Sequence, residues 1–125
     1  MKAITFLLLI FLLALQGCGL LGSPETTANQ FMNHLVQEEY EAAKELSTDK
    51  THQLIHLLQA AQSLADEEQR AEKRKAVFEC SCEQEAETAQ CNCCENGDAN
   101  ECNTLTVVKV EGKWLVDMKK ENGLH

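Results

Sequence analysis

The sequence CSCEQEAETAQCNCC, residues 80–94, contains five of the chain's seven cysteines. Cys80 and Cys82 are two positions apart, as are Cys91 and Cys93, and a period of two residues predicts β-strands rather than a helix. Directly opposed residues on antiparallel strands have Cα atoms about 4.5–5.5 Å apart, which is close enough for a disulfide. The stretch therefore predicts a cysteine-bearing β-hairpin, and Cys102 follows it by eight positions.

The two-residue period continues beyond this hairpin. Glu111-Gly112 is typical of a two-residue hairpin loop, and such a loop would pair Val107 with Val116. The four predicted strands are residues 77–83, 88–94, 102–110 and 113–119. One face of the last hairpin collects apolar side chains and is the predicted core face: Leu105, Val107, Trp114, Val116 and Met118.

Residues 24–46 predict the first helical segment. Ser23 can cap it, and Pro24 suits the first helical position because the N–H that proline lacks would be unpaired there. The apolar positions follow one another at steps of three, four and five residues, and the irregular step falls at residues 37–39. This irregularity predicts a bend, or two short helices that meet there.

Residues 50–75 predict a second helical segment, which Thr48-Asp49 would cap. Beyond Asp66 nearly every residue is charged, so this end of the helix is expected to be exposed. The acidic residues precede the basic ones, an order that suits the helix dipole. Six residues share one face of a helical wheel and are expected to be the apolar face: Leu54, Leu57, Leu58, Ala61, Leu64 and Ala65.

Helices followed by an antiparallel meander with one apolar face predict an α+β fold. We expect N-terminal helices packed on a curved, four-stranded antiparallel sheet that disulfides hold together. The formal net charge of −9 argues against a nucleic-acid partner, which requires a positive surface. Self-association into a homodimer through the sheet is left open.

The chain begins MKAITFLLLIFLLALQGC, residues 1–18. Lys2 precedes an uncharged apolar run, residues 3–15, which suits a secretory signal and is shorter than the ~20 residues of a membrane-spanning helix. The last four residues, Leu15 to Cys18, resemble a bacterial lipobox. This resemblance implies that the chain is cut before Cys18 and that the Cys18 thiol carries a covalent lipid, with no other cofactor expected.

The chain is thereby divided into a signal peptide (1–17), a lipidated cysteine with a tether (18–23), and one α+β domain (24–125). Two or more acyl chains hold a protein stably at a membrane without a spanning helix. The expected location is the bacterial cell envelope, outside the cytosol. In some bacteria an aspartate directly after the lipidated cysteine retains a lipoprotein at the inner membrane. Gly19 stands at that position here, and this favours the outer membrane.

Assigning Cys18 to lipid leaves six cysteines, and six cysteines in an exported domain indicate three disulfides with fifteen connectivities. Strand parity narrows these connectivities, although the adjacent Cys93 and Cys94 leave a shuffled pairing open. The pairs it predicts are Cys80–Cys93, Cys82–Cys91 and Cys94–Cys102. The same geometry leaves a metal site open, because four thiolates on one hairpin face could bind zinc or copper(I), namely those of Cys80, Cys82, Cys91 and Cys93.

Two stretches, SPETTANQFMNHLVQEEYEAAKELS (23–47) and LTVVKVEGKWLVDMKK (105–120), together resemble the small bacterial lipoproteins with a nuclear transport factor 2-like fold. The resembling marks are the aromatic-x-x-Ala unit of Tyr40 and Ala43 and the terminal hairpin, residues 112–117. Members of that family usually have Gly-Asp or Gly-Asn before the tyrosine, whereas Glu38-Glu39 stands here. The resemblance implies a curved sheet wrapped around helices as a cone with an apolar mouth.

Such cones serve enzymes such as ketosteroid isomerase and also non-catalytic binders, so the fold alone leaves the function open. An isomerase-like site needs a carboxylate in an apolar pocket and an oxyanion donor, for which Asp117 and Tyr40 are the candidates. Asp117 is expected on the face away from the core and Tyr40 in packing. We therefore expect a non-catalytic domain that binds a small apolar ligand or an envelope protein; the alternatives are a thiolate metal-binding lipoprotein and a cone-type enzyme.

The histidines are expected to be structural. His52 and His56 are four residues apart, which is a metal-ligand spacing, but the helical wheel places them opposite the leucines, on the solvent side. The Glu of a His-Glu-x-x-His metalloprotease motif does not follow His52. His34 is expected at the boundary of the first helix's apolar stripe.

Overall fold

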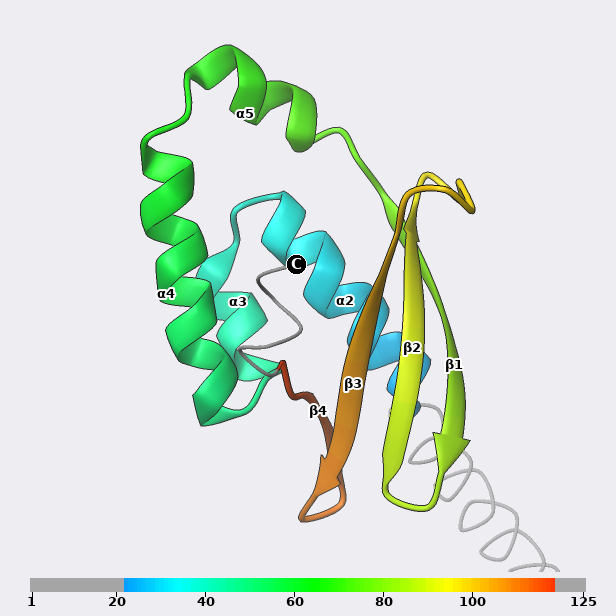
Figure 1. Ribbon diagram of the computed structural model, residues 1–125. Coiled ribbons are helices and arrows are strands. Elements are labelled where there is room, and N and C mark those ends of the chain that lie inside the picture. The colour runs from blue at the N-terminus through cyan, green and yellow to red at the C-terminus, as the bar shows by residue number, and fades with distance from the viewer. Residues whose placement is uncertain (1–21, 119–125) are drawn as a thin grey trace, which may run out of the picture.

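The computed structural model describes residues 22–118. Within these residues, four helices precede four strands, and the strands form one antiparallel sheet in the order β1-β2-β3-β4 (Figure 1). This arrangement confirms the predicted α+β class and the meander. The elements are α2 (Pro24–Val36), α3 (Tyr40–Glu45), α4 (Asp49–Ser63), α5 (Glu67–Lys73), β1 (Phe78–Glu85), β2 (Thr88–Glu95), β3 (Cys102–Val110) and β4 (Lys113–Val116).

The predicted signal peptide and Cys18 lie outside the described residues. Within residues 22–118, none of the helices combines the length and the apolar character that crossing a bilayer demands.

The break between α2 and α3 confirms the predicted irregularity at residues 37–39. Ser23 caps α2 as expected, because its Oγ accepts a hydrogen bond from the N–H of Thr26 at 3.1 Å. In the break, Glu38 has a φ of +62°, the left-handed backbone that favours glycine. A non-glycine residue is strained there by about 1–2 kcal/mol.

The predicted single helix over residues 50–75 is wrong. The chain leaves the helix after Ser63, and a separate helix, α5, begins at Glu67. Asp66 causes the restart, because its Oδ1 accepts the N–H of Gln69 at 2.9 Å and so caps a new helix. The charged end expected to be exposed is thus a helix of its own.

The expected apolar face of α4 is only partly buried. Thr51 and Ile55 are the buried residues of this helix, with 0% and 2% of their surface exposed. Leu57 and Leu64 are 62% and 90% exposed. The helix is anchored by Thr51, whose hydroxyl donates to the Val116 carbonyl at 3.2 Å and accepts the Met118 N–H at 2.9 Å. This anchor rotates the leucine face partly away from the core.

The sheet has the predicted register, with Cys80 opposite Cys93, Cys91 opposite Leu105, and Val107 opposite Val116. β4 is shorter than predicted and ends at Val116, although the Asp117 N–H still donates to the Thr106 carbonyl of β3 at 2.9 Å. The inner face of the sheet packs against α2 and forms the core. Its buried members include Ala28, Phe31, Met32, Phe78, Ala89, Leu105, Val107, Trp114 and Val116.

Helix α2 also covers the free edge of β1. Three of its side chains, four residues apart, accept hydrogen bonds from every second N–H of the strand: Glu25 from Cys82 at 3.5 Å, Asn29 from Cys80 at 2.8 Å, and Asn33 from Phe78 at 2.9 Å. An uncovered edge would offer these groups to a strand of another chain. Two side-chain amides and one carboxylate here take the place of a fifth strand.

The opposite edge of the sheet is covered as well. The Val116 N–H donates to the Leu46 carbonyl at 2.8 Å, and the Val116 carbonyl accepts the Thr48 N–H at 2.9 Å. These bonds come from the segment between α3 and α4. Because both edges are occupied along these stretches, the sheet is poorly suited to bind a partner by strand addition.

Replacing Asn33 with alanine is expected to lower the free energy of unfolding by about 1–3 kcal/mol, because the Phe78 N–H loses its partner in a half-buried place. Urea unfolding followed by circular dichroism measures the loss. Asn92→Ala is the matched control, since the Asn92 side chain is exposed on the outer face of β2 and its one contact is a weak 3.8 Å bond to Cys94. Equal stability of the two variants would contradict a role for Asn33 at the edge.

Candidate functional site

The six cysteines of the domain form three disulfides, and these are the pairs that strand parity predicts. Each pair has Cα atoms 4.0 Å apart: Cys80–Cys93, Cys82–Cys91 and Cys94–Cys102. Cys91 and Cys93 are fully buried on the core face. A sulfur held in a disulfide is not a thiolate ligand, and residues 22–118 contain no group of three or more His, Cys, Asp or Glu placed to hold a metal.

The two candidate residues for a cone-type enzyme, Asp117 and Tyr40, differ in their surroundings. Asp117 accepts a 2.7 Å hydrogen bond from the Thr48 hydroxyl, which links the end of β4 to the start of α4. The hydroxyl oxygen of Tyr40 is buried and has no hydrogen-bond partner among the described residues. Burial, and secondarily the charge of Glu38, raises the pKa of Tyr40. Neither residue lines the two pockets described next.

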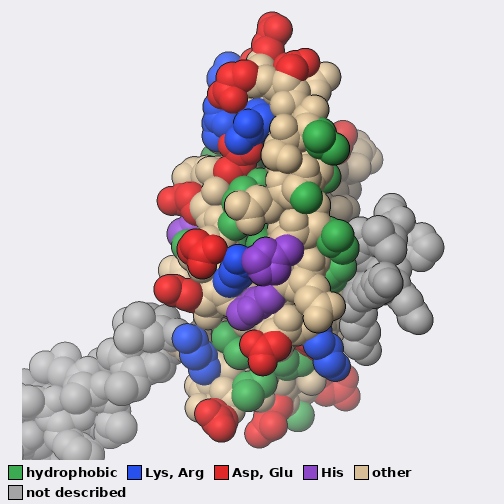
Figure 2. All heavy atoms as spheres, turned by 90° about the vertical axis from the view of Figure 1, so that its left-hand side faces the viewer, with side chains coloured by type: hydrophobic (Ala, Val, Ile, Leu, Met, Phe, Trp, Pro, Cys, Tyr) green, Lys and Arg blue, Asp and Glu red, His purple; other side chains and the backbone are tan. Residues whose placement is uncertain are grey.

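The histidines on α4 do not act as a pair. The Nε2 of His52 lies 2.8 Å from the Lys44 carbonyl oxygen, whereas His56 is exposed. The expectation that His52 faces solvent is thus wrong in part, because it is half-buried against α3. Figure 2 shows histidine side chains on this side of the molecule among acidic and apolar ones. His34 lies 3.2 Å from Glu39 across the break after α2.

A pocket of about 450 Å³, the α4 pocket, lies along the leucine face of α4. Every residue of its lining is apolar: Leu35, Leu54, Ile55, Leu57, Leu58, Ala61 and Met118. The partial exposure of α4 leucines is therefore the exposure of a pocket wall. Apolar linings of this size are typical of small-molecule sites.

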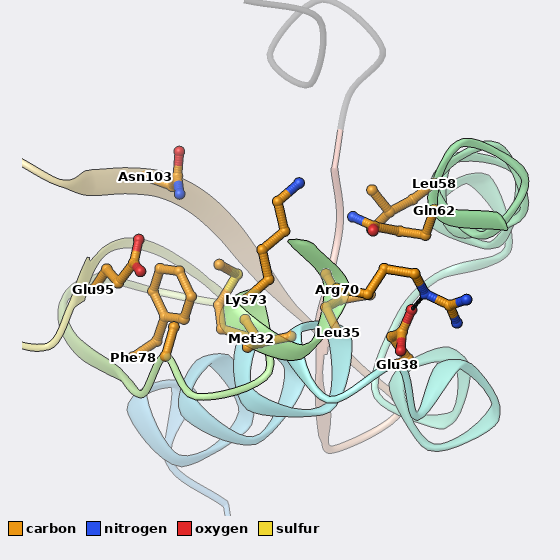
Figure 3. Close-up of a pocket in the computed structure, with 12 residues that line it drawn as sticks. Met32, Leu35, Glu38, Leu58, Gln62, Arg70, Lys73, Phe78, Glu95 and Asn103 are labelled. Carbon is orange, nitrogen blue, oxygen red and sulfur yellow. Dashed lines mark hydrogen bonds and ion pairs between the residues drawn. The ribbon is translucent and has the colours of Figure 1, made fainter. Parts of the chain in front are cut away.

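A second pocket of about 380 Å³, the α5 pocket, lies between α2, α4, α5 and the sheet (Figure 3). It shares Leu35 and Leu58 with the α4 pocket, so the two adjoin along an apolar boundary. Its lining combines apolar and polar groups: Met32, Leu35, Val36, Glu38, Leu58, Gln62, Arg70, Lys73, Ala76, Phe78, Glu95 and Asn103. The two acidic and two basic side chains in this lining balance, which disfavours a ligand with a large net charge.

Glu38 joins the break after α2 to helix α5. Its Oε1 accepts the Arg70 Nε–H at 2.8 Å and its Oε2 accepts an Arg74 Nη1–H at 2.6 Å, so each carboxylate oxygen meets one guanidinium. Glu67 accepts a second Arg74 bond at 2.7 Å. Only 15% of the Glu38 side chain is exposed, against 31% and 33% for the arginines. We call Glu38, Arg70 and Arg74 the clamp.

The clamp has a defined response to pH. Hydrogen bonds from Arg70, then from Arg74, hold the pKa of the Glu38 carboxyl below the ordinary glutamate value. A carboxyl whose pKa is lower in the folded state stabilises that state above the unfolded pKa and loses this contribution as the pH falls through the folded pKa. The clamp is therefore fully formed at neutral pH and is lost only in acid.

Neither the pockets nor the clamp was predicted from the sequence, although one signal was present. The signal is the irregular step at residues 37–39, which contains Glu38, but the arginine partners of Glu38 lie 32 and 36 positions away in the sequence. Comparisons of the chain with models of protein families, with curated proteins and with solved structures find no match.

Proposed function

We propose that this domain is a non-catalytic binding module that holds a small, uncharged apolar molecule in the α4 and α5 pockets. The observation that carries the proposal is the apolar boundary at Leu35 and Leu58, where two pockets meet. Each volume lies in the range of about 300–1,000 Å³ that is common for small-molecule sites. When an apolar molecule packs against this lining, each Å² of apolar surface removed from water contributes about 25 cal/mol of favourable free energy.

A non-catalytic role is supported by the positions of the ionisable groups. The carboxylates that line the α5 pocket are Glu38 and Glu95, and Glu38 is already bonded to two arginines. A proton-abstracting carboxylate in an apolar site would have a raised pKa, whereas that of Glu38 is lowered. Asp117, the predicted candidate base, lines neither pocket.

We further propose that the chain is a bacterial envelope lipoprotein anchored through Cys18, with the outer membrane as its favoured location. The lipobox-like residues 15–18 support this, and so does the pairing of all six remaining cysteines, since disulfides persist in oxidising compartments. A nuclear transport factor 2-like cone is the fold we propose. It is supported by helices that lie on one face of a four-stranded sheet (Figure 1) and by the apolar lining of the α4 pocket.

Fluorescence titration with the uncharged apolar probe N-phenyl-1-naphthylamine tests the proposed binding. We expect saturable binding to the wild-type domain. Leu58→Glu is expected to weaken this binding by about 30-fold or more, because a carboxylate at the shared wall must be desolvated when the probe enters.

Gln59→Glu is the matched control for this experiment. Gln59 is the neighbour of Leu58 on α4, is exposed, and lines neither pocket, so the same new charge there should leave probe binding unchanged. Circular dichroism verifies that both variants are folded. Wild-type protein without saturable binding, or equal binding by the two variants, would contradict the proposed site.

A further inference from the structure

Helix α5 covers the α5 pocket without being part of the core. None of its residues is buried. It runs from the end of α4 to the start of β1, across the top of α2 in the view of Figure 1, with non-helical links at residues 64–66 and 74–77. Arg70 and Lys73 nevertheless contribute to the pocket lining. A seven-residue helix is not stable by itself, so contacts outside the helix must hold it in place.

The clamp supplies those contacts. Arg70 lies on α5, and Arg74 is the first residue after this helix. Both donate hydrogen bonds to the carboxylate of Glu38. Figure 3 shows Arg70 and Glu38 pointing toward each other at one side of the α5 pocket, while Lys73 extends beside it. The remaining charged partner is Glu67 on α5, which accepts a bond from Arg74 at 2.7 Å and lies 3.7 Å from Arg70.

Glu38 holds this position in a strained backbone. A glycine at φ +62° would avoid the strain, but it would also remove the carboxylate. Strained residues persist where surrounding contacts stabilise them, and they are concentrated at ligand clamps and switch regions. The other non-glycine residues of the described chain with positive φ, Ala86, Asn96 and Glu111, all follow strands in turns. Glu38 alone among these four lies between helices.

We propose that α5 is a lid over the α5 pocket, that the clamp of Glu38, Arg70 and Arg74 holds it closed, and that ligand enters and leaves when the clamp opens. The lid regulates the site of the proposed function and rests on that proposal. Partly exposed ion pairs contribute little stability, so a helix held mainly by them opens more readily than the core. Salt screens such pairs and is expected to favour opening.

Hydrogen–deuterium exchange without ligand tests whether the clamp holds α5. In Glu38→Gln the amides of residues 67–73 are expected to exchange about tenfold faster, the loss expected for one charge-assisted hydrogen bond, while β1–β4 keep their protection. Arg74→Gln should act in the same direction, and Arg74 does not line the pocket. Glu72→Gln is the matched control, because Glu72 lies on α5 but bonds only the exposed Lys75, at 3.0 Å.

Stopped-flow mixing with N-phenyl-1-naphthylamine tests whether α5 gates the pocket. Association and dissociation rates should both rise about fivefold in Glu38→Gln and Arg74→Gln and stay at the wild-type values in Glu72→Gln. Raising the salt concentration should accelerate both rates in the wild type and have little effect in Glu38→Gln. The probe is uncharged, so the salt acts on the protein.

The two measurements separate the lid from the binding proposal. Unchanged exchange of α5 in Glu38→Gln and Arg74→Gln would overturn the lid, whatever the probe does. Faster exchange with unchanged probe rates would also overturn it, because α5 would then move without gating the pocket. If the wild type does not bind the probe, the proposed function fails, and with it the gating role that rests on it, while the exchange data still decide whether the clamp holds α5.

Discussion

Replacing Ile55 with alanine is expected to lower the free energy of unfolding by about 2–4 kcal/mol. Ile55 is 2% exposed and is the large apolar side chain that α4 places in the core. Truncation removes buried methylene and methyl groups and leaves a cavity that the surrounding side chains fill only in part. Urea unfolding of the purified domain, with an unchanged dependence on denaturant, measures this loss.

Leu57→Ala is the control on the same helix. Leu57 is 62% exposed, so its truncation is expected to change stability by less than about 0.5 kcal/mol. The comparison tests which side of α4 faces the core, since the leucine pattern alone predicts that Leu57 is buried. A loss for Leu57→Ala as large as that for Ile55→Ala would contradict the orientation of α4.

Removing the Cys80–Cys93 disulfide with the double substitution Cys80→Ala and Cys93→Ala is expected to lower the free energy of unfolding by about 2–4 kcal/mol. The bond spans 13 residues, but the remaining Cys82–Cys91 bond already closes 9 of them, so the unfolded state gains little freedom and most of the loss comes from packing. Cys93 is also fully buried, so the substitution leaves unfilled space beneath the sheet. The neighbouring Cys82–Cys91 bond remains and keeps the hairpin paired.

The matched control removes Cys94–Cys102 by the same kind of double substitution. Both of its cysteines are half-buried on the outer face, so their truncation leaves less unfilled space than that of the buried Cys93, and a smaller packing loss is expected. Intact mass with and without reductant, beside metal analysis, verifies the bonding. Oxidised wild-type protein should be lighter than the reduced chain by about six mass units, two for each disulfide. Six free thiols with bound zinc or copper would contradict the disulfides and favour the metal-binding alternative.

The sheet was predicted from the sequence more closely than the helices. Side-chain period in a strand is two, so the spacing of Cys80, Cys82, Cys91 and Cys93 assigns each residue to a face, and one register satisfies all the pairs. The helical segment 50–75 gave no equivalent constraint. From the sequence, Asp66 is equally compatible with a position inside a helix and with the cap of a new one. In the structure it accepts a hydrogen bond from the Gln69 N–H, which identifies it as a cap.

The candidate site was the least predictable part. Apolar periodicity indicates which α4 residues share a face but does not distinguish a core face from a pocket wall. Leu58 would occupy the same position in the apolar pattern whether it lay in the core or in a pocket wall. The orientation of α4 is set by the hydrogen bond from Thr51 to Val116 at the end of β4, two residues that are 65 positions apart.

The sequence by itself determined the class of the fold, the order of helices and strands, the sheet register and the disulfide pairs, because these depend on local periodicity and on strand parity. The tertiary structure alone decided that α5 is a separate helix held by Glu38 across 32 and 36 residues, and that the leucines of α4 line a pocket. These features depend on which distant groups meet in space. A strained glutamate or an exposed leucine acquires its role only from the partners that the fold brings to it.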